Sequence, residues 1–319
     1  MKKISNLLMM ALLAIGMGLT SCDEQLDNAV TPYTPGVTPT VEEAIMYGFK
    51  VTDLAGVDRT EAVTSLKMSN DDATVATAEV SGGKITIKAD DLKEITTAMD
   101  FWFEAEIGGK PYIAKVNIDP TTLSPESDKT LEMATLGDVI LSDGKFAAPS
   151  STGTKVAKIA YLGNDAETNY NHGLALALED VSGTKTWCSQ TSATCLGTQY
   201  DDSNKFNDMA GIANTDALVN HTDHTTHDAA SAARGYNSGT HPAGTSVWFL
   251  PSAGQWNKMA TAASGYANLK TNAGLQENVY YWSSTEVSAL YAWTFYSNNG
   301  NWTTGNKSGA TQVRACLAF

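Results

Sequence analysis

Val247-Trp248-Phe249-Leu250-Pro251-Ser252 opens a stretch that runs to the terminal Phe319 and holds five of the seven tryptophans of the chain. Between these tryptophans the residues are mainly Asn, Ser, Thr, Gly and Tyr. Aromatic rings among small polar side chains are typical of recognition surfaces, because Tyr and Trp supply contact area at low entropic cost. They are equally typical of a loop-rich domain that fills its core with large rings. The rest of the chain is expected to anchor this end and to hold it away from a membrane.

The N-terminus has the pattern of an exported lipoprotein. Lys2 and Lys3 precede a short apolar run at residues 7–15, which is typical of a secretory signal and too short for a membrane span. The segment Leu19-Thr20-Ser21-Cys22 resembles a bacterial lipobox. Residues 1–21 are therefore expected to be removed and Cys22 to carry the lipid anchor that contacts the membrane. The alternative is an ordinary signal peptide followed by a chance cysteine.

The residues after Cys22 bear on the location of the anchor. Asp23 and Glu24 resemble a surface-export signal of some Gram-negative lineages, whereas Asp at this position resembles an inner-membrane retention signal in others. We expect the outer membrane, with the protein facing the cell exterior, because an aromatic and polar C-terminal stretch is suited to contacts outside the cell.

The charge of the chain excludes nucleic acid as a partner. The net charge is −14, and removal of the signal leaves 19 basic against 35 acidic residues, or −16. Such a surface repels phosphate backbones. Only 18% of residues are charged, and Ser, Thr, Asn and Gly are abundant, which is typical of extracellular β-rich or loop-rich proteins. About 298 mature residues predict roughly two domains.

The first domain is predicted at residues 43–119, after a proline-containing tether at residues 22–42. Apolar and polar residues alternate along its runs, as at residues 101–107, and Gly-Gly pairs at 82–83 and 108–109 are typical hairpin turns. This pattern predicts a small all-β antiparallel sandwich. It contains no histidine or cysteine, so we expect a spacer or a pilin-like (fimbrillin-like) module without chemistry of its own.

A second domain is predicted at residues 131–319, after a linker at 120–130 that contains two prolines. Its pattern is mixed α+β with long polar loops. Strands are expected at residues 137–146, 156–162, 173–180, 279–284, 289–295 and 311–317. Helices are expected at residues 204–221, at 228–234 and after Pro251, with Ser252 as the N-cap.

Four short segments of this domain, taken with their order along the chain, indicate its fold. They are residues 137–144 (GDVILSDG), 248–252 (WFLPS), 281–286 (YWSSTE) and 313–315 (VRA). Together they resemble the C-terminal domain of many bacterial surface lipoproteins, the major paralogous domain type. That domain is a variant of the C-type-lectin fold related to formylglycine-generating enzyme. The resemblance covers roughly residues 135–319 and implies ligand binding or adhesion more often than catalysis. Fold alone does not fix function.

Within that family, the tail is similar to variable proteins diversified by retroelements, in which surface positions change on a constant aromatic scaffold. The alternative is an ordinary lectin-like domain with a polar loop edge. The resemblance implies a framework of Tyr281, Trp282, Trp293, Phe295, Trp302, Val313, Arg314 and Phe319. It implies a ligand-binding surface made of Val287, Tyr291, Thr294, Tyr296, Ser297, Asn299, Asn301, Trp302, Thr303, Thr304, Asn306, Ser308 and Ala310.

Two groups of side chains are candidates for a reactive or metal-binding role. His221, His224 and His227, spaced by three, are candidates for a zinc or nickel site if they share a helical face, but Thr and Asp between them favour a solvated loop. Cys188 and Cys195 either close a disulfide loop or remain thiols, since spacing does not set the geometry.

Catalysis is not expected from the remaining features. Cys316 lies between apolar residues and is expected to pack as a small hydrophobe. The calcium-binding motifs of sugar-binding lectins are absent from the sequence.

The sequence therefore predicts a lipid-anchored surface protein that is not an enzyme and needs no cofactor. Its C-terminal surface is expected to bind an unknown extracellular protein or glycan. The first alternative is a pilus-tip or structural surface subunit that assembles with other subunits. A metal-dependent enzyme centred on the three histidines is the second.

Overall fold

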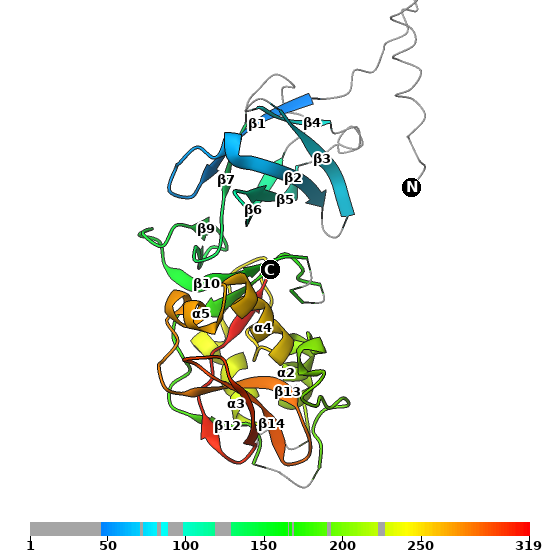
Figure 1. The fold of residues 1–319 in the computed structure, drawn as a ribbon, viewed down its shortest axis with the longest axis vertical. Helices are drawn as coiled ribbons and strands as arrows, with labels where there is room; N and C mark the ends of the chain where they lie inside the picture. Colours follow the sequence, from blue (N-terminus) through cyan, green and yellow to red (C-terminus); the bar gives the residue numbers. More distant parts are fainter. Residues whose placement is uncertain are drawn as a thin grey trace, which may run out of the picture. The chain divides into compact units, whose positions relative to one another are not determined.

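The structure is a computed structural model that describes residues 46–70, 73–81, 84–88, 98–118, 129–164, 166–167, 169–189, 193–222 and 227–319 (Figure 1). The predicted signal, Cys22 and the tether lie outside the described residues, as do residues 119–128 of the predicted linker region. Residues 46–319 group into one compact unit. None of the described helices is long and apolar enough to cross a membrane.

A seven-stranded sheet makes up the N-terminal part of this unit. Its neighbouring strands are antiparallel except β1 and β7, which pair in parallel. In sheet order the strands are β6 (Lys110–Ile118), β5 (Met99–Ile107), β2 (Val63–Asn70), β3 (Ala73–Ser81), β4 (Lys84–Lys88), β1 (Met46–Asp53) and β7 (Lys129–Met133).

This sheet folds over on itself. Strand β3 pairs with β2 through residues 73–77 and with β4 through residues 78–81, so it passes from one half of the sheet to the other. The rings of Phe49 on β1 and Phe103 on β5 lie 5.5 Å apart, although three strands separate β1 from β5 in the sheet. The antiparallel β structure predicted for residues 43–119 is therefore confirmed. Strand β7 adds a parallel pairing from beyond that range.

The turn between β5 and β6 requires glycine. Gly108 and Gly109 have φ angles of 57° and 75°, in the left-handed region that glycine adopts without a steric cost. The predicted hairpin at this Gly-Gly pair is confirmed, with Ile107 opposite Lys110. The alternation along β5 is confirmed as well, since Phe101 and Phe103 are fully buried.

The second face of this hairpin is buried too. Trp102 and Ile113 lie on the face of the sheet that does not carry Phe101 and Phe103. Their side chains are nevertheless only 9% and 1% exposed. The backbone of Ile113 exchanges two hydrogen bonds of 2.8 and 2.7 Å with Ala134, and both residues join the core of the C-terminal part. Strand β6 is therefore tied to the chain that follows β7.

The C-terminal part holds three further sheets. Mixed α+β structure with several small antiparallel sheets, as predicted, is confirmed. One sheet has the order β17 (Cys316–Ala318), β11 (Gly173–Ala177), β10 (Lys155–Leu162), β8 (Val139–Leu141) and β9 (Phe146–Ala147). A second has the order β13 (Tyr280–Glu286), β14 (Tyr291–Tyr296) and β15 (Trp302–Asn306), and the third pairs β12 (Lys185–Thr186) with β16 (Ala310–Thr311).

Four α-helices accompany these sheets in the described part of the chain. Helices α4 and α5 pack against β10, and α2 packs against β13 (Figure 1). The helix predicted at residues 228–234 is confirmed, whereas the one predicted at 204–221 is a 3₁₀ turn, η3, followed by the shorter α2. The elements are α2 (Gly211–Val219), α3 (Asp228–Arg234), α4 (Ala253–Ala262) and α5 (Tyr266–Ala273), with 3₁₀ turns η1 (Thr60–Ala62), η3 (Lys205–Asn207) and η5 (Tyr236–Gly239).

Helix α4 begins at the predicted cap. The Ser252 hydroxyl accepts a hydrogen bond from the Gln255 backbone N–H, and the Gln255 side chain accepts one from the Ser252 N–H, which completes a capping box. The same hydroxyl donates to the carbonyl of Asp208 at 2.6 Å. Ser252 is fully buried, so one side chain both starts the helix and fixes the loop before α2.

We predict that Ser252→Ala lowers the free energy of unfolding by about 1–2 kcal/mol, because it removes the cap and leaves buried backbone groups without their partner. Urea unfolding of the full chain measures this loss. Thr261→Ala, at an exposed position of the same helix, is the control and should leave stability unchanged or slightly higher. Equal stability of the two variants would contradict the role given to the cap.

Candidate functional site

The sheet of β13, β14 and β15 has two chemically different faces. Tyr281, Phe295 and Trp302 are cross-strand partners and therefore lie on one face. This face packs inward, with Phe295 4.7 Å from the ring of Trp256 and 5.0 Å from that of Tyr266. The indole N–H of Trp302 donates to the Tyr266 hydroxyl at 2.8 Å. The inward face is thus an aromatic core.

The outward face carries a cavity of about 310 Å³. Tyr280 pairs with Tyr296, Trp282 with Thr294, and Thr294 with Thr303, which places all five on this face. Strand β16 and the turn before it close one side. The lining residues are Tyr280, Trp282, Thr294, Thr303, Thr304, Gly305, Asn306, Gly309, Ala310 and Thr311.

The floor of this cavity depends on a close approach between Gly305 and Trp282. A Cβ atom at Gly305 would lie 2.7 Å from the Trp282 ring and 3.0 Å from the Thr294 methyl group. Only glycine lets β15 pass this close to the indole. The Trp282 N–H donates to the Lys185 carbonyl at 2.8 Å, which holds the ring in place under the strand.

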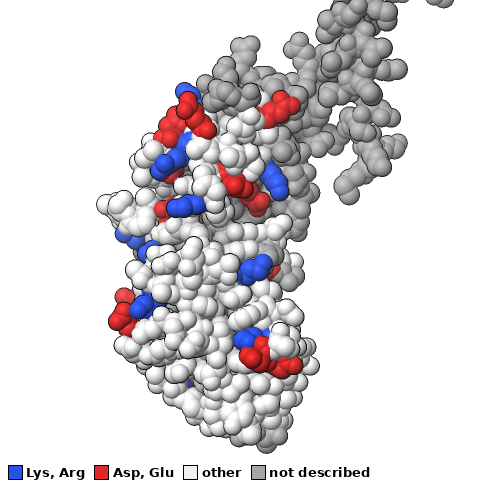
Figure 2. All heavy atoms as spheres, viewed as in Figure 1, with Lys and Arg blue, Asp and Glu red and all other residues white. Residues whose placement is uncertain are grey.

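The side chains that line this cavity are uncharged. Its lining offers hydroxyl groups, one amide, an indole and the phenol of Tyr280, which is 43% exposed, and contains no Asp, Glu, Lys or Arg. On the face drawn in Figure 2, charged side chains gather mainly over the seven-stranded sheet, and broad areas of the C-terminal part are uncharged. The cavity can therefore hold a neutral polar ligand through hydrogen bonds and ring contacts.

Five of the thirteen predicted binding residues meet at this cavity. Of the others, several are exposed on the same sheet or its turns without lining it, and Val287, Tyr296 and Trp302 are half-buried. The five are Thr294, Thr303, Thr304, Asn306 and Ala310. The exposed ones are Tyr291, Asn299, Asn301 and Ser308.

Two predicted surface positions are not on the surface. Ser297 is fully buried, where its hydroxyl accepts from the Val279 N–H at 3.3 Å. Thr294 is 3% exposed and reaches solvent only through the cavity floor. Alternation does not reveal this, because Ser297 follows β14 and Thr294 packs beside Trp282 and Gly305 on the outward face. Trp302, predicted in both roles, belongs to the aromatic core. The other predicted framework residues are at most 4% exposed.

A buried ion pair supports the sheet from one end. Glu286, the last residue of β13, and Lys307, just after β15, form an ion pair with both side chains 0% exposed. The Glu286 carboxylate also accepts from the backbone N–H groups of Cys195 and Leu196, at 2.7 and 2.8 Å, and from the Gln199 amide. The pair therefore fixes the loop at residues 195–199 against the sheet.

A second buried pair joins the sheet to the C-terminal strand. Arg314 forms an ion pair with Asp180 and donates to the carbonyls of Ala177 and Gly274. The Tyr281 hydroxyl donates to the same Asp180 carboxylate at 2.7 Å. Burial and this carboxylate raise the pKa of Tyr281, so the phenol stays protonated. These contacts explain why Arg314 was correctly placed in the framework although it is charged.

The three described cysteines are thiols in this structure. Cys188 and Cys195 lie with their sulfur atoms 3.8 Å apart and are not bonded to each other. Burial raises the pKa of Cys195 to about 12, against the lowering effect of Lys307. Burial likewise raises the pKa of Cys316, which is fully buried as expected. Burial therefore works against Cys195 and Cys316 acting as activated nucleophiles.

The expectation of a solvated histidine loop is wrong for His227. Its side chain is 0% exposed, at the residue before α3, and its ring lies 6.3 Å from that of Trp187. Helix α2 ends at Val219 and α3 starts at Asp228, so His221 and His227 do not share one helical face. His224 lies outside the described residues.

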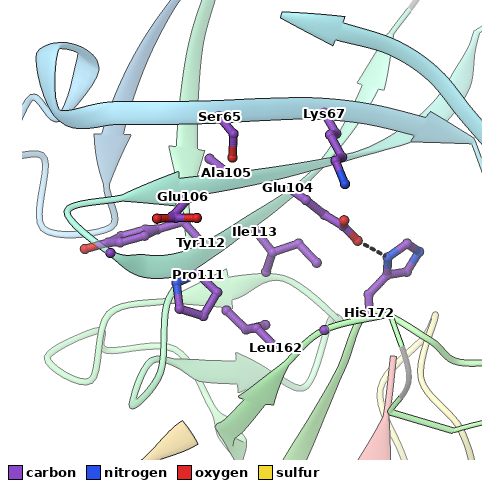
Figure 3. A pocket seen from close by; sticks show the side chains of 12 residues that line it. Ser65, Lys67, Glu104, Ala105, Glu106, Pro111, Tyr112, Ile113, Leu162 and His172 are labelled. Carbon is purple, nitrogen blue, oxygen red and sulfur yellow. Dashed lines mark hydrogen bonds and ion pairs between the residues drawn. The ribbon is translucent and has the colours of Figure 1, made fainter.

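A second cavity, of about 260 Å³, lies where the seven-stranded sheet meets Leu162, Gly163 and His172 (Figure 3). Lys67, Glu104 and Tyr112 line it from the sheet, and His172 lines it from the C-terminal part. The Nδ1 atom of His172 lies 3.0 Å from the Glu104 carboxylate, and its ring stacks on Trp102 at 4.1 Å. These contacts join two parts of the fold. Sequence analysis missed them because the partners lie far apart in the chain.

Comparisons with known proteins leave the family open. No protein-family profile and no curated protein matches the chain. Among solved structures, a crystal structure of a fimbrial protein from Bacteroides ovatus is similar with a TM-score of 0.46 and 14% sequence identity. The match covers 86% of this chain and 70% of that one. At this distance, the fold family and the function have to be argued from the residues of this chain.

We predict a pH-dependent contribution from the contact in Figure 3. The hydrogen bond to His172 holds the pKa of Glu104 below 4.5, its usual value, despite partial burial. A carboxylate with a lowered pKa in the fold stabilises it above the unfolded pKa, and this stabilisation is lost as the pH falls through the folded pKa. Glu104→Gln should cost less than about 1 kcal/mol at pH 7, since Glu104 is partly exposed.

The measurement is urea unfolding of the full chain and of this variant from neutral pH to below 4.5. Their difference should shrink as the pH drops. Glu61→Gln, at an exposed position of η1, is the control and should show a smaller change with pH. A constant difference across the range would contradict the role assigned to Glu104.

Proposed function

We propose that this chain is a cell-surface binding protein whose C-terminal part holds an uncharged ligand in the cavity over β13, β14 and β15. The observation that supports this most is the meeting of five predicted binding positions at one cavity of about 310 Å³. A buried ion pair at the end of the sheet and an aromatic core behind it keep the cavity in a fixed shape. Preorganised sites of this kind lose little entropy on binding.

The ligand class follows from the lining. Threonine hydroxyls and the Asn306 amide both donate and accept hydrogen bonds, and the exposed Tyr280 ring offers an apolar surface beside them. A neutral oligosaccharide presents the complementary groups, hydroxyls and apolar C–H faces. Ionic ligands have no counter-charge in the lining. We take a neutral glycan as the ligand class.

The proposal includes the C-type-lectin fold for roughly residues 135–319 and a lipid anchor on Cys22 in the outer membrane. What supports the fold assignment is the position of the four ordered segments. Residues 137–144 contain β8 and the turns on either side of it, and residues 248–252 lead into α4. Residues 281–286 are most of β13, and residues 313–315 lead into β17. The anchor rests on residues 19–22 alone.

Sequence diversification of this surface is part of the same proposal. The cavity and the exposed turns of β13–β15 are the positions that such variation would alter without touching the aromatic core. Sequencing the last ~40 codons of the gene across many cells of one strain checks this, with variation expected at surface-loop codons. A uniform tail would leave a receptor of fixed specificity.

The alternative function is a pilus-tip or structural surface subunit. The Bacteroides ovatus structure similar to this chain is that of a fimbrial protein, a likeness too distant to carry an argument. Recovery of the full chain in high-molecular-weight surface fibres would favour this alternative. A binding cavity at the C-terminal end is compatible with a tip subunit of such a fibre.

The direct test is Thr303→Arg. The new side chain projects from β15 over the cavity and should reduce binding at least tenfold on an array of neutral oligosaccharides. The fold should be kept, because the hydrogen bond from Thr294 ends on the Thr303 carbonyl, which the variant retains. Stability should stay within about 0.5 kcal/mol, as for other surface substitutions.

Thr271→Arg is the matched control. It makes the same change at an exposed position of α5, outside the cavity, and should bind like the unaltered chain. Equal binding by the two variants would contradict the location of the site. Absence of any bound oligosaccharide for the unaltered chain would contradict the ligand class.

A further inference from the structure

Three metal-binding side chains from separate parts of the sequence meet in the C-terminal part. They are Cys188, Cys195 and His227, and their ligand atoms all lie within 4.8 Å of one another. Cys188 and His227 are fully buried, and Cys195 is half-buried. The group lies apart from the proposed ligand cavity, whose lining includes none of the three.

The distance between the two sulfur atoms agrees with shared coordination of a metal ion. In a tetrahedral zinc site with Zn–S bonds of about 2.3 Å, two thiolate sulfurs lie about 3.8 Å apart. The sulfurs of Cys188 and Cys195 lie 3.8 Å apart. A disulfide would require about 2.05 Å, so the two thiols face each other at the separation of two ligands.

Hydrogen bonds outside the group hold two of its members in position. The Thr186 hydroxyl donates to the Asp228 carboxylate at 2.6 Å. Thr186 lies two residues before Cys188, and Asp228 directly follows His227, so this one bond joins the two segments. The Cys188 N–H also donates to the Lys307 carbonyl at 3.1 Å. Supporting contacts of this kind are typical of metal sites.

The third member is held by the buried ion pair. The Cys195 N–H donates to the Glu286 carboxylate at 2.7 Å, and the ammonium group of Lys307 lies 3.9 Å from the Cys195 sulfur. The same pair that supports the sheet therefore also positions one ligand.

We propose that Cys188, Cys195 and His227 bind one zinc ion, which ties these three side chains together as a structural site. Two thiol protons leave when the sulfurs bind the metal, and the His227 imidazole binds in its neutral form. Water or His221, whose ring lies 5.1 Å from that of His227, supplies the fourth position. The site is separate from ligand binding at the β13–β15 face.

The test uses the full mature chain with reduced thiols. Native mass spectrometry with added zinc should show one ion per chain. Cobalt in place of zinc should give the near-ultraviolet charge-transfer absorption of cobalt–thiolate bonds. Both readouts use the unaltered protein and do not depend on whether a variant folds. Failure to bind zinc, or a cobalt spectrum without thiolate absorption, would overturn the proposal.

Ligand variants locate the ion. Cys188→Ser and Cys195→Ser should each weaken zinc affinity by more than about 100-fold, since loss of a supporting contact alone costs 10–100-fold. Cys316→Ser, the same change at the third described cysteine, is the control and should bind as the unaltered chain does. Equal loss in all three variants would overturn the site. The proposal would also be overturned if the isolated protein contained a disulfide between Cys188 and Cys195 and bound no zinc after this disulfide was reduced.

Discussion

The buried ion pair between Glu286 and Lys307 is the contact on which the C-terminal part depends. Both side chains are 0% exposed, and two unpaired charges in such a place would cost several kcal/mol each. Glu286 offsets this by accepting from two backbone N–H groups of the 195–199 loop. The Lys307 carbonyl accepts from the N–H groups of Trp187 and Cys188. The ion pair and the Lys307 backbone thus connect the sheet to the loops at residues 187–188 and 195–199.

This arrangement explains how the sheet of β13, β14 and β15 can present a polar face. Aromatic rings pack against its inward side, the ion pair holds its end, and Tyr281 on β13 donates to Asp180, the partner of Arg314. The outward side is then free to carry threonines, asparagine and glycine, which contribute little to packing. Gly305 and Trp282 set the depth of the cavity. Substitutions at its exposed positions, such as Thr303 and Thr304, should therefore leave the aromatic core unchanged.

Local patterns in the sequence predicted much of this. The Ser252 cap, the Gly108-Gly109 turn and helix 228–234 follow from short-range chemistry, and the aromatic framework follows from residue type. Strand β15 was missed because Trp302–Asn306 contains a glycine and exposed threonines and shows no apolar alternation. The burial of Trp102 and Ser297 depends on segments far away in the chain. For the same reason, two cysteines and a histidine that sequence analysis treated as separate groups meet at one place.

The most direct test of this account is a double-mutant cycle on the ion pair, measured by urea unfolding of the full chain. Glu286→Gln and Lys307→Met should each lower the unfolding free energy by about 3–5 kcal/mol, since each leaves one buried charge or its partners unpaired. The double variant should lose at least about 1 kcal/mol less than the sum of the two single losses. Additive losses would show that the two residues act independently, and would contradict the claim that this pair holds the sheet and its loops together.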